Sequence, residues 1–563
     1  MDAPVSDASR ASAKGWRGDC LIWLALLATL AGPFLLGSPH SGPVAHYDRR
    51  LVILSPHHER IRQEIGDAFV SDWRDRNGET VYIDWRIPGG SSEIVLFLKS
   101  EFAGAFQYYW ESRLHRVWSQ PVARAFADPR TAPNGSNPEE WEAREAFLNS
   151  NVGVGVDLLF GGGSYDFQQQ AEAGYLVAGG AGIGLTSLID RHPDWFRPEV
   201  FPESVGGEPF RDRDNRWIGV ELATFGIVYN RDVWHRLGIA GEPAQWSDLT
   251  DPRLAGQIAM ADPTKSGSVA KAFELIVQQQ MQQAVARRTA AGRAGPVAEA
   301  EGIREGWLAG LKLIQRMSAN ARYFTDSAGK IPLEISRGDA AAGMAIESYG
   351  KAAEEYVRQA DGHSRVGFVA PLGGTSVSVD PVALLRGAPD PRLATEFMEF
   401  VLSPRGQKLW AFRPGTPGGP VSTALRRLPV RRDFYTESNR PHMSEPDAQP
   451  YVQAGHFVYH PRWTGPLFGA LRFLIRVMCV ETHPEQRRAW RDMIDQGMPA
   501  AALAAFHDLS GLEYDEVLRR IAPVLRGKDK VGEARLAREL SGVFRERYRR
   551  AGRLAMAGDP ASS

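Results

Sequence analysis

The segment "LVILSPHHERIRQEIGDAFVSDWRDR" (residues 51–76) determines the fold class, because its hydrophobic pattern changes from that of a strand to that of a helix. Residues 51–55 form an apolar run with the length of a buried strand. After them, Ile61, Ile65 and Phe69 recur at the spacing that places apolar side chains on one face of a helix. A strand followed directly by a helix is the unit from which α/β sheets are built.

The same alternation continues along the chain. A second strand, "VYIDWR" (81–86), precedes a helix that starts behind the Gly/Ser turn "GGSS" (89–92). Further strands are predicted at 156–160, 225–230, 256–263, 342–350, 366–371 and 378–385, and an apolar-faced helix at 391–410. Repeated units of this kind predict parallel α/β sheets.

Two regions depart from this alternation. Residues 100–150 are rich in Trp, Arg and Pro and are predicted to form a mostly helical insertion. In the long final part of the chain, 459–477 is predicted to be packed structure. The Arg-rich helical end near 535–553 is predicted to be a solvated face rather than a nucleic-acid site.

Composition limits the class of protein. The 563 residues are 43% hydrophobic and 24% charged, as in an ordinary globular chain with two or more domains. The net charge of −1 gives no electrostatic argument for nucleic acid as a partner. The two cysteines, Cys20 and Cys479, have no zinc-site spacing and are not expected to form a disulfide.

The N-terminus is typical of a targeting segment. Arg10, Lys14 and Arg17 precede the apolar run "LIWLALLATLAGPFLL" (21–36). No clear cleavage site follows, so residues 1–47 are predicted to be either a signal peptide or an N-terminal membrane anchor. The rest of the chain is then expected outside the cytoplasmic membrane. The alternative is that this run is a buried core helix of a cytosolic protein.

Small, hydroxyl and histidine residues follow four of the predicted strands. Ligands of open α/β sheets bind beyond the carboxyl ends of the strands, so these positions form the candidate site. Glycines let a ligand approach the backbone closely, and the start of a helix attracts anions. The candidate ligand-binding residues are His57, His58, Gly162, Gly163, Ser164, Thr264, Ser266, Gly267, Ser268, Glu347 and Tyr349.

The most specific of these hypotheses concerns "ADPTKSGSVAKAFELIVQQQM" (261–281). The N–H and hydroxyl groups of Ser266, Gly267 and Ser268 would hold an anion at the start of a helix. The alternative is that a serine only caps that helix. Each of the other candidates also has a purely structural interpretation. The histidines would hydrogen-bond to the backbone, the glycines would only form a turn, and Tyr349 would pack in the core.

Several phrases occur in an order similar to that of the extracellular solute-binding proteins of bacterial ABC importers. They include "DWRIPGGSSEI", "DLLFGGGSYDF", "QWSDLTDPRLAGQIAMADPTKSGS" and "APDPRLATEFMEFVLSPRGQKLW". The resemblance runs from about residue 50 to residue 415. Its nearest branch is the ferric-iron-binding group, with phosphonate- and polyamine-binding relatives.

The resemblance implies an α/β, two-lobed periplasmic-binding-protein-like (type II) fold, here with an added helical insertion and a C-terminal helical extension. Two hinge crossings, expected near 222–230 and 346–372, would join the lobes. The domains expected after the N-terminal segment are lobe 1 at 48–224, lobe 2 at 225–366, a return to lobe 1 at 367–430, and a mostly helical extension at 431–563.

The resemblance also implies roles for some residues. His57 matches the family's iron-ligating histidine, and Ser266–Ser268 matches the segment that holds a synergistic anion. The family's paired tyrosines fall on Ser348 and Tyr349, so one phenolate is missing, and its carboxylate ligand falls on glycines. A metal site would rest on His57, Tyr349 and a bound anion, which are too few for ferric iron unless Glu59, Glu221 or Glu347 also coordinates it. A small anion is therefore supported at least as well as iron.

The expected function is the substrate-binding component of an ABC-type importer, with a permease and an ATPase as partners. The solute would be a small anion or an anion-assisted metal ion, with no cofactor and no nucleic acid. The alternative is a membrane-anchored extracytoplasmic sensor or scaffold with the same lobes. An enzyme using His57, His58 and Glu59 is a third class, but no nucleophile elbow or third metal ligand supports it, so we expect no catalysis.

Overall fold

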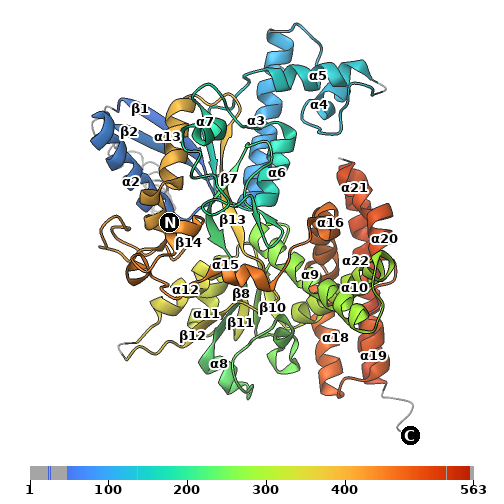
Figure 1. The fold of residues 1–563 in the computed structure, drawn as a ribbon. Helices are drawn as coiled ribbons and strands as arrows, with labels where there is room; N and C mark the ends of the chain where they lie inside the picture. The colour runs from blue at the N-terminus through green and yellow to red at the C-terminus, as the bar shows by residue number, and fades with distance from the viewer. Residues whose placement is uncertain are drawn as a thin grey trace, which may run out of the picture.

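The computed structural model describes residues 47–135, 137–359, 361–527 and 529–557, together with Trp23 and Leu26. The segment predicted to be a signal peptide or anchor therefore lies almost entirely outside the described residues. The described part contains two α/β lobes, each built on its own sheet, and a helical region that follows them (Figure 1).

Lobe 1 is built on a sheet with the strand order β14-β7-β13-β3-β1-β2, and β4 pairs with β13 at one side. β1 runs parallel to β2 and β3, but β13 runs antiparallel to β3 and β7. The predicted parallel pairing therefore holds for β1, β2 and β3 but not for β13, because β7 leads out to the other lobe and β13 returns from it. The strands are β1 (Arg49–Leu54), β2 (Val81–Arg86), β3 (Leu158–Phe160), β4 (Leu176–Val177), β7 (Ile218–Ala223), β13 (Ser378–Leu385) and β14 (Leu428–Pro429).

Lobe 2 is built on a five-stranded sheet with the order β10-β9-β11-β8-β12. β9 runs parallel to β10 and β11, whereas β8 runs antiparallel to β11 and β12. Its strands are β8 (Phe225–Asn230), β9 (Ile258–Ala261), β10 (Ala321–Thr325), β11 (Ala342–Ile346) and β12 (Val366–Val369). A separate two-stranded hairpin, β5 (Ser204–Val205) and β6 (Glu208–Pro209), lies beside lobe 1.

The chain passes between the lobes twice. The first passage is at Thr224, between the last residue of β7 and the first of β8. The second lies between Val369, which ends β12, and Ser378, which starts β13. That is later than the expected 346–372, because the strand at 342–346 belongs wholly to lobe 2. Two short backbone segments therefore join the lobes, as a hinge requires.

Helices cover both sheets, and the helices predicted after the first strand, behind the turn at 89–92 and from residue 266 begin close to those positions. The predicted helix at 391–410 is two helices, because Ser403 has an extended backbone (ψ 158°) ahead of Pro404 and caps the second one. The lobe helices are α2 (Glu59–Asn77), α6 (Ser164–Ala173), α7 (Gly184–Arg191), α8 (Arg231–Arg236), α9 (Gly267–Ala290), α10 (Pro296–Ala319), α11 (Lys330–Arg337), α12 (Glu347–Tyr356), α13 (Pro391–Leu402) and α14 (Pro404–Ala411).

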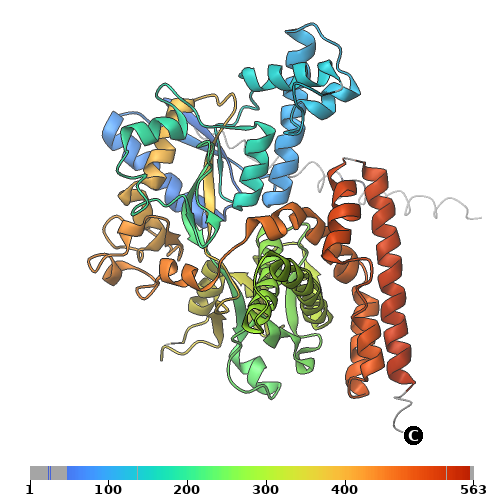
Figure 2. The ribbon, with the colours of Figure 1, turned by 45° about the vertical axis from the view of Figure 1, so that its right-hand side comes forward.

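The predicted helical insertion projects from lobe 1 as α3 (Ser91–Ser112), α4 (Gln120–Ala125) and α5 (Pro138–Asn149) (Figure 1). The C-terminal region is helical, as predicted, and stands beside α9 and α10 of lobe 2 (Figure 2). Its helices are α15 (Pro450–Gln453), α16 (Pro461–Thr464), α17 (Phe468–Ile475), α18 (His483–Asp495), α19 (Ala500–Phe506), α20 (Tyr514–Glu516), α21 (Ala522–Arg526) and α22 (Lys530–Met556).

The C-terminal helices share one hydrophobic core with lobe 2, and lobe 1 has a second core. Buried hydrogen bonds hold the C-terminal helices against lobe 2. Trp307 of α10 donates to the Leu512 carbonyl at 2.8 Å. Trp490 of α18 donates to the Asn320 side chain at 2.7 Å. Because these bonds lie in a continuous core, the extension and lobe 2 are expected to move as one body.

One helical stretch of the described residues, Pro461–Val480, is long and apolar enough to cross a membrane. In the fold, 67% of its most apolar window is buried. α17, within it, packs against α9 and α21. Burial against protein is what a core helix requires, so its composition is explained without a membrane.

Candidate functional site

A cavity of about 700 Å³ lies between the two lobes. The starts of α6 and α9 reach it from opposite lobes, and the hinge strands form one side. The hairpin β5–β6 and the C-terminal region form the remaining walls of the cavity. Its lining includes Gly163, Ser164, Tyr165, Asp166, Glu208, Arg211, Asp212, Arg216, Phe225, Gly267, Ser268, Lys271, Ser378, Asp380, Tyr459 and Phe468.

The start of α9 combines a cap with free donors. Ser266 has an extended backbone, and its hydroxyl accepts from the Val269 N–H at 3.4 Å, so this serine is the helix cap. Gly267 and Ser268 follow in the first turn and line the cavity. The first N–H groups of a helix have no partner within it. The cavity therefore faces a positive helix end, while Ser266 is already used for capping.

The start of α6 comes from lobe 1. Gly161 and Gly162 adopt positive φ of 89° and 119°, and Gly163 then leads into the helix at Ser164. Within the first turn of α6, the Asp166 carboxylate lies close to the start of α9: a Cβ on Gly267 would be 3.3 Å from its Oδ2. Burial raises the pKa of Asp166, and the charge of Arg472 opposes the rise. The protein's own carboxylate thus lies at the anion-attracting end of α9.

Most cations of the cavity wall are already neutralised. Arg211 pairs with Glu203 at 2.6 Å, and Arg216 pairs with Asp212 at 2.7 Å. The Asp166 carboxylate forms no hydrogen bond or ion pair with another described residue. A bound anion therefore gains little from these paired cations and depends on the helix ends, the hydroxyls and Arg213, which also lines the cavity.

Lys271 lies one turn into α9 and is held by a buried network. Its Nζ is 3.0 Å from Glu208 of the hairpin and 3.0 Å from Glu274 of its own helix. The same Nζ lies 3.4 Å from the centre of the Tyr459 ring, which comes from the C-terminal region. Burial opposes the ammonium charge, but the two carboxylates outweigh it and raise the pKa of Lys271.

His57 does not reach the cavity. Its ring is buried in lobe 1 against Phe160, at 4.8 Å between ring centres, and against Trp410. A Cβ on Gly161 would lie 2.3 Å from its Nε2, so the glycine makes room for the ring. Burial lowers the pKa of His57 well below its usual range, so the imidazole is neutral. Nε2 has no hydrogen-bond partner among the described residues.

His58 and Tyr349 meet across the lobes on the other side of the cleft. Their rings lie edge to face, 4.8 Å apart. Tyr349 also lies under Arg427, whose guanidinium carbon is 5.6 Å from the ring centre. Arg427 pairs with the fully buried Glu221 at 2.7 Å. This cluster lies at the hinge, behind the cavity.

Asp380 connects this cluster to the cavity, because it lines the wall and lies 3.5 Å from Arg427. Burial raises the pKa of Asp380 and raises that of Glu221 well above its usual range, and Arg427 opposes both shifts. Two carboxylates therefore share one guanidinium at the hinge.

The remaining candidates have structural partners. The Glu347 carboxylate accepts a hydrogen bond from the Thr224 hydroxyl at 2.7 Å. Thr224 is the residue at which the chain first crosses between the lobes. The Thr264 hydroxyl donates to Asp262 at 2.7 Å. Gly162 packs near Ser91, with 3.3 Å from a Cβ to the serine oxygen. Of the eleven candidates, Gly163, Ser164, Gly267 and Ser268 line the cavity.

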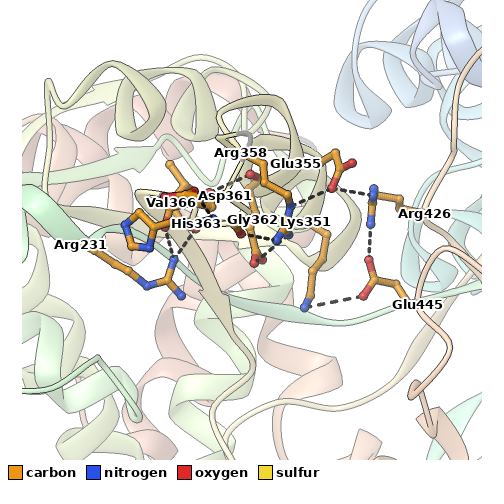
Figure 3. Close-up of polar contacts among 12 residues, drawn as sticks. Arg231, Lys351, Glu355, Arg358, Asp361, Gly362, His363, Val366, Arg426 and Glu445 are labelled. Carbon is orange, nitrogen blue, oxygen red and sulfur yellow. Dashed lines mark hydrogen bonds and ion pairs between the residues drawn. The ribbon is translucent and has the colours of Figure 1, made fainter.

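Charged side chains also join the lobes at the outer edge near α12. Arg426, which follows the return to lobe 1, pairs with Glu355 of α12 at 3.1 Å. Lys351 of α12 lies 3.8 Å from Glu445, which also pairs with Arg426 (Figure 3). Ion pairs of partly exposed side chains are screened by salt, so this edge is expected to add little to the stability of the closed cleft.

The described residues contain no group of three or more His, Cys, Asp and Glu side chains arranged to hold a metal ion. The two predicted metal ligands, His57 and Tyr349, lie in different surroundings, and it is His58 that touches the tyrosine. Ferric iron requires several hard anionic ligands, which this arrangement does not supply.

Sequence reasoning missed three kinds of cavity residue. Lys271 is one helical turn beyond Gly267 and Ser268, so helical spacing was a usable signal. Asp166 lies within the first turn of α6, two residues after the predicted Ser164. Tyr459 and Phe468 had no local signal, because only the tertiary fold brings the C-terminal region to the cleft.

Comparison with protein families gives the class of the central part. Residues 196–429 match the model of the bacterial extracellular solute-binding protein family. This segment is similar to a bacterial extracellular solute-binding domain. The matched range holds the hinge passages, the start of α9 and the whole lobe 2 sheet. The predicted resemblance to solute-binding proteins is therefore confirmed, and the family is one of binding proteins rather than enzymes.

Individual relatives are distant. An uncharacterised protein of Haemophilus influenzae is 24% identical to this chain over 254 residues, covering 45% of this chain. The chain spans 60% of the length of that curated relative.

Solved structures with similar chains include periplasmic binding proteins. AfuA from Actinobacillus pleuropneumoniae, with fructose-6-phosphate bound, is 18% identical with a TM-score of 0.41, covering 64% of this chain and 81% of AfuA. Iron-bound HitA from Pseudomonas aeruginosa is 16% identical with a TM-score of 0.42, covering 75% and 98%. PotD from Streptococcus pneumoniae is 12% identical with a TM-score of 0.41, covering 75% and 99%.

Proposed function

We propose that the protein captures a small organic anion between its lobes and delivers it to the permease and ATPase of an ABC importer. The observation that carries this proposal is that α6 and α9, one from each lobe, start at the same cavity. Each helix start carries about half a positive charge, so the two together attract an anionic group. Ser164 and Ser268 add hydroxyl donors beside them.

The cavity size favours an organic solute over a bare ion. A volume of about 700 Å³ is in the range of small-molecule sites. A metal ion would fill only a small part of it, and the predicted metal pair is not assembled there. Asp380 and the aromatic rings on the wall suit the hydroxyl and apolar parts of an organic molecule.

Substitution of the two serines tests the anion site. Ser164→Ala and Ser268→Ala are each expected to weaken binding of inorganic phosphate or glucose 6-phosphate, by about tenfold for each ~1.4 kcal/mol of hydrogen bonding lost. Titration calorimetry measures this. The matched control is Ser266→Ala, which should lower the free energy of unfolding by about 1 kcal/mol and leave affinity unchanged. Equal affinity in all three variants would show that the serines only shape the helices.

A cationic amine is the second candidate, because the Asp166 carboxylate forms no ion pair with another described residue and aromatic side chains line the same cavity. Such a pair of features also binds ammonium groups. Asp166→Asn separates the two candidates. It should raise the affinity for inorganic phosphate if the solute is an anion, since an internal competitor is removed. A loss of spermidine binding, with phosphate unaffected, would instead establish the amine.

The proposed location is outside the cytoplasmic membrane, with the N-terminal segment either cleaved or retained as an anchor. N-terminal sequencing of the mature protein, together with cell fractionation, decides between these. Recovery of the full-length chain from the cytoplasm would contradict the proposal. If the anchored protein signals without any permease, the sensor alternative is correct.

A further inference from the structure

Residues that follow the family match form part of the cleft. After the return to lobe 1, α15 lies at the boundary between the two sheets, and the chain then reaches the C-terminal helices (Figures 1 and 2). Tyr459, Pro461, Gly465 and Phe468 all line the cavity. The region past residue 429 is therefore a third wall beside the two lobes.

This wall is bonded to the hairpin on the lobe 1 side. The Tyr459 N–H donates to the Gly206 carbonyl at 2.7 Å. Gly207 has a φ of +79°, and a Cβ there would lie 1.9 Å from the Tyr459 carbonyl oxygen. Only a residue without a side chain allows the two backbones to approach so closely.

It is bonded to α9 on the lobe 2 side. The hydroxyls of Tyr459 and Thr464 both donate to Glu274, at 2.9 Å and 2.5 Å. Gln278, one turn further along α9, donates to the Thr464 hydroxyl at 2.7 Å. All of these side chains are buried, so the wall is fixed to lobe 2.

Arg472 of α17 contacts both lobes at once. Its guanidinium donates to the carbonyls of Pro263 and Thr264, just before α9, at 2.8 Å and 2.9 Å. It also donates to the Ser92 hydroxyl at the start of α3 in lobe 1, at 2.8 Å. One planar group with several donors therefore ties the cleft edges together.

Phe468, one turn before Arg472, adds an aromatic contact across the lobes. Its ring lies 4.4 Å from the ring of Tyr165 at the start of α6. Phe468 is 3% exposed, and both rings line the cavity. Because α17 moves with lobe 2, opening the cleft would separate Phe468 from Tyr165 and Arg472 from Ser92.

We propose that Phe468 and Arg472 make the C-terminal region a working part of the solute site. Arg472 latches the two lobes together, and the Phe468–Tyr165 pair sets the size of the solute that the closed cleft accepts. The part of this proposal that concerns solute size rests on the proposed function. The part that concerns Arg472 as a latch depends only on contacts within the protein.

Small-angle X-ray scattering of the full chain, without added solute, tests the latch. Arg472→Gln and Phe468→Leu are expected to increase the radius of gyration, because the lobe 1 contacts are lost. Arg476→Gln is the matched control. Arg476 lies one turn beyond Arg472 and pairs with Glu481 at 3.1 Å. Among the described residues, its side chain has no hydrogen bond or ion pair to lobe 1. An unchanged radius in both test variants, with folding intact by circular dichroism, would overturn the latch.

Calorimetry with two probes tests the size-setting role. Phe468→Leu should change the affinity for glucose 6-phosphate by about tenfold and leave that for inorganic phosphate within about twofold, since only the larger probe reaches the ring. Equal changes for both probes would contradict the role of Phe468 in solute size. If neither probe binds the unmutated protein, the solute is not a phosphate of this kind, and the scattering result alone decides whether Arg472 is a latch.

Discussion

Arg427→Met is expected to lower the free energy of unfolding by about 3–5 kcal/mol, because it leaves buried carboxylates without their counter-ion. Glu221 is 0% exposed, pairs with Arg427 at 2.7 Å and keeps one carboxylate oxygen without a partner among the described residues. Urea unfolding followed by circular dichroism measures the loss. Where the variant does not fold, Arg427→Lys provides a milder test that retains the positive charge.

The loss should depend on pH. Burial raises the pKa of Glu221, and Arg427 opposes that rise, so the variant raises it further. A carboxyl group whose pKa is raised by folding contributes stability below its ordinary pKa of about 4.3 and loses it as the pH rises. The difference between the variant and the unmutated protein should therefore grow from pH 4 to pH 7. A control, Arg358→Met, removes partly exposed ion pairs with Glu354 and Glu355 and an exposed hydrogen bond to the Gly362 carbonyl, and should cost about 1 kcal/mol. A pH-independent loss equal to that of the control would contradict this account of the hinge.

Lys271→Met is expected to have the second large effect, again about 3–5 kcal/mol in the free energy of unfolding. Its ammonium neutralises Glu208 and Glu274, both 1% exposed. The double variant Lys271→Met with Glu208→Gln should recover part of the loss, because one unpaired carboxylate is then removed while Ser376 retains its acceptor. Thermal unfolding of the single and double variants measures the recovery. Lys330→Met, at an exposed pair with Asp326, is the control. No recovery in the double variant would show that Lys271 contributes mainly through packing.

The sequence predicted the lobes well because local periodicity is strong there. The apolar run at 51–55 and the helical spacing of Ile61, Ile65 and Phe69 reappear as β1 and α2. The direction of β13 could not be predicted in this way, because it depends on the chain returning from the other lobe. A local pattern predicts that a segment forms a strand. The order and direction of the strands in a sheet depend on pairing between segments far apart in the sequence.

The candidate site was predicted only where its signal was local. The glycines and serines that start α6 and α9 follow strands directly, and four of them reach the cavity. His57 follows a strand too, yet the positive φ of Gly161 lets its ring turn into the core of lobe 1. The direction of a side chain after a strand is set by such packing. Phe468 and Tyr459 are more than 190 residues from Ser266 in the sequence, so no local pattern could place them in the cleft.

The central claim is that the cleft holds an organic anion between the starts of α6 and α9. Native mass spectrometry of the protein purified from its own compartment, with elemental analysis, tests it most directly. We predict a non-covalent organic solute bearing phosphate or carboxylate, lost in Gly267→Val, whose side chain would crowd Asp166 3.3 Å away. Stoichiometric iron without an organic solute, or the same bound mass in Gly267→Val, would contradict the claim.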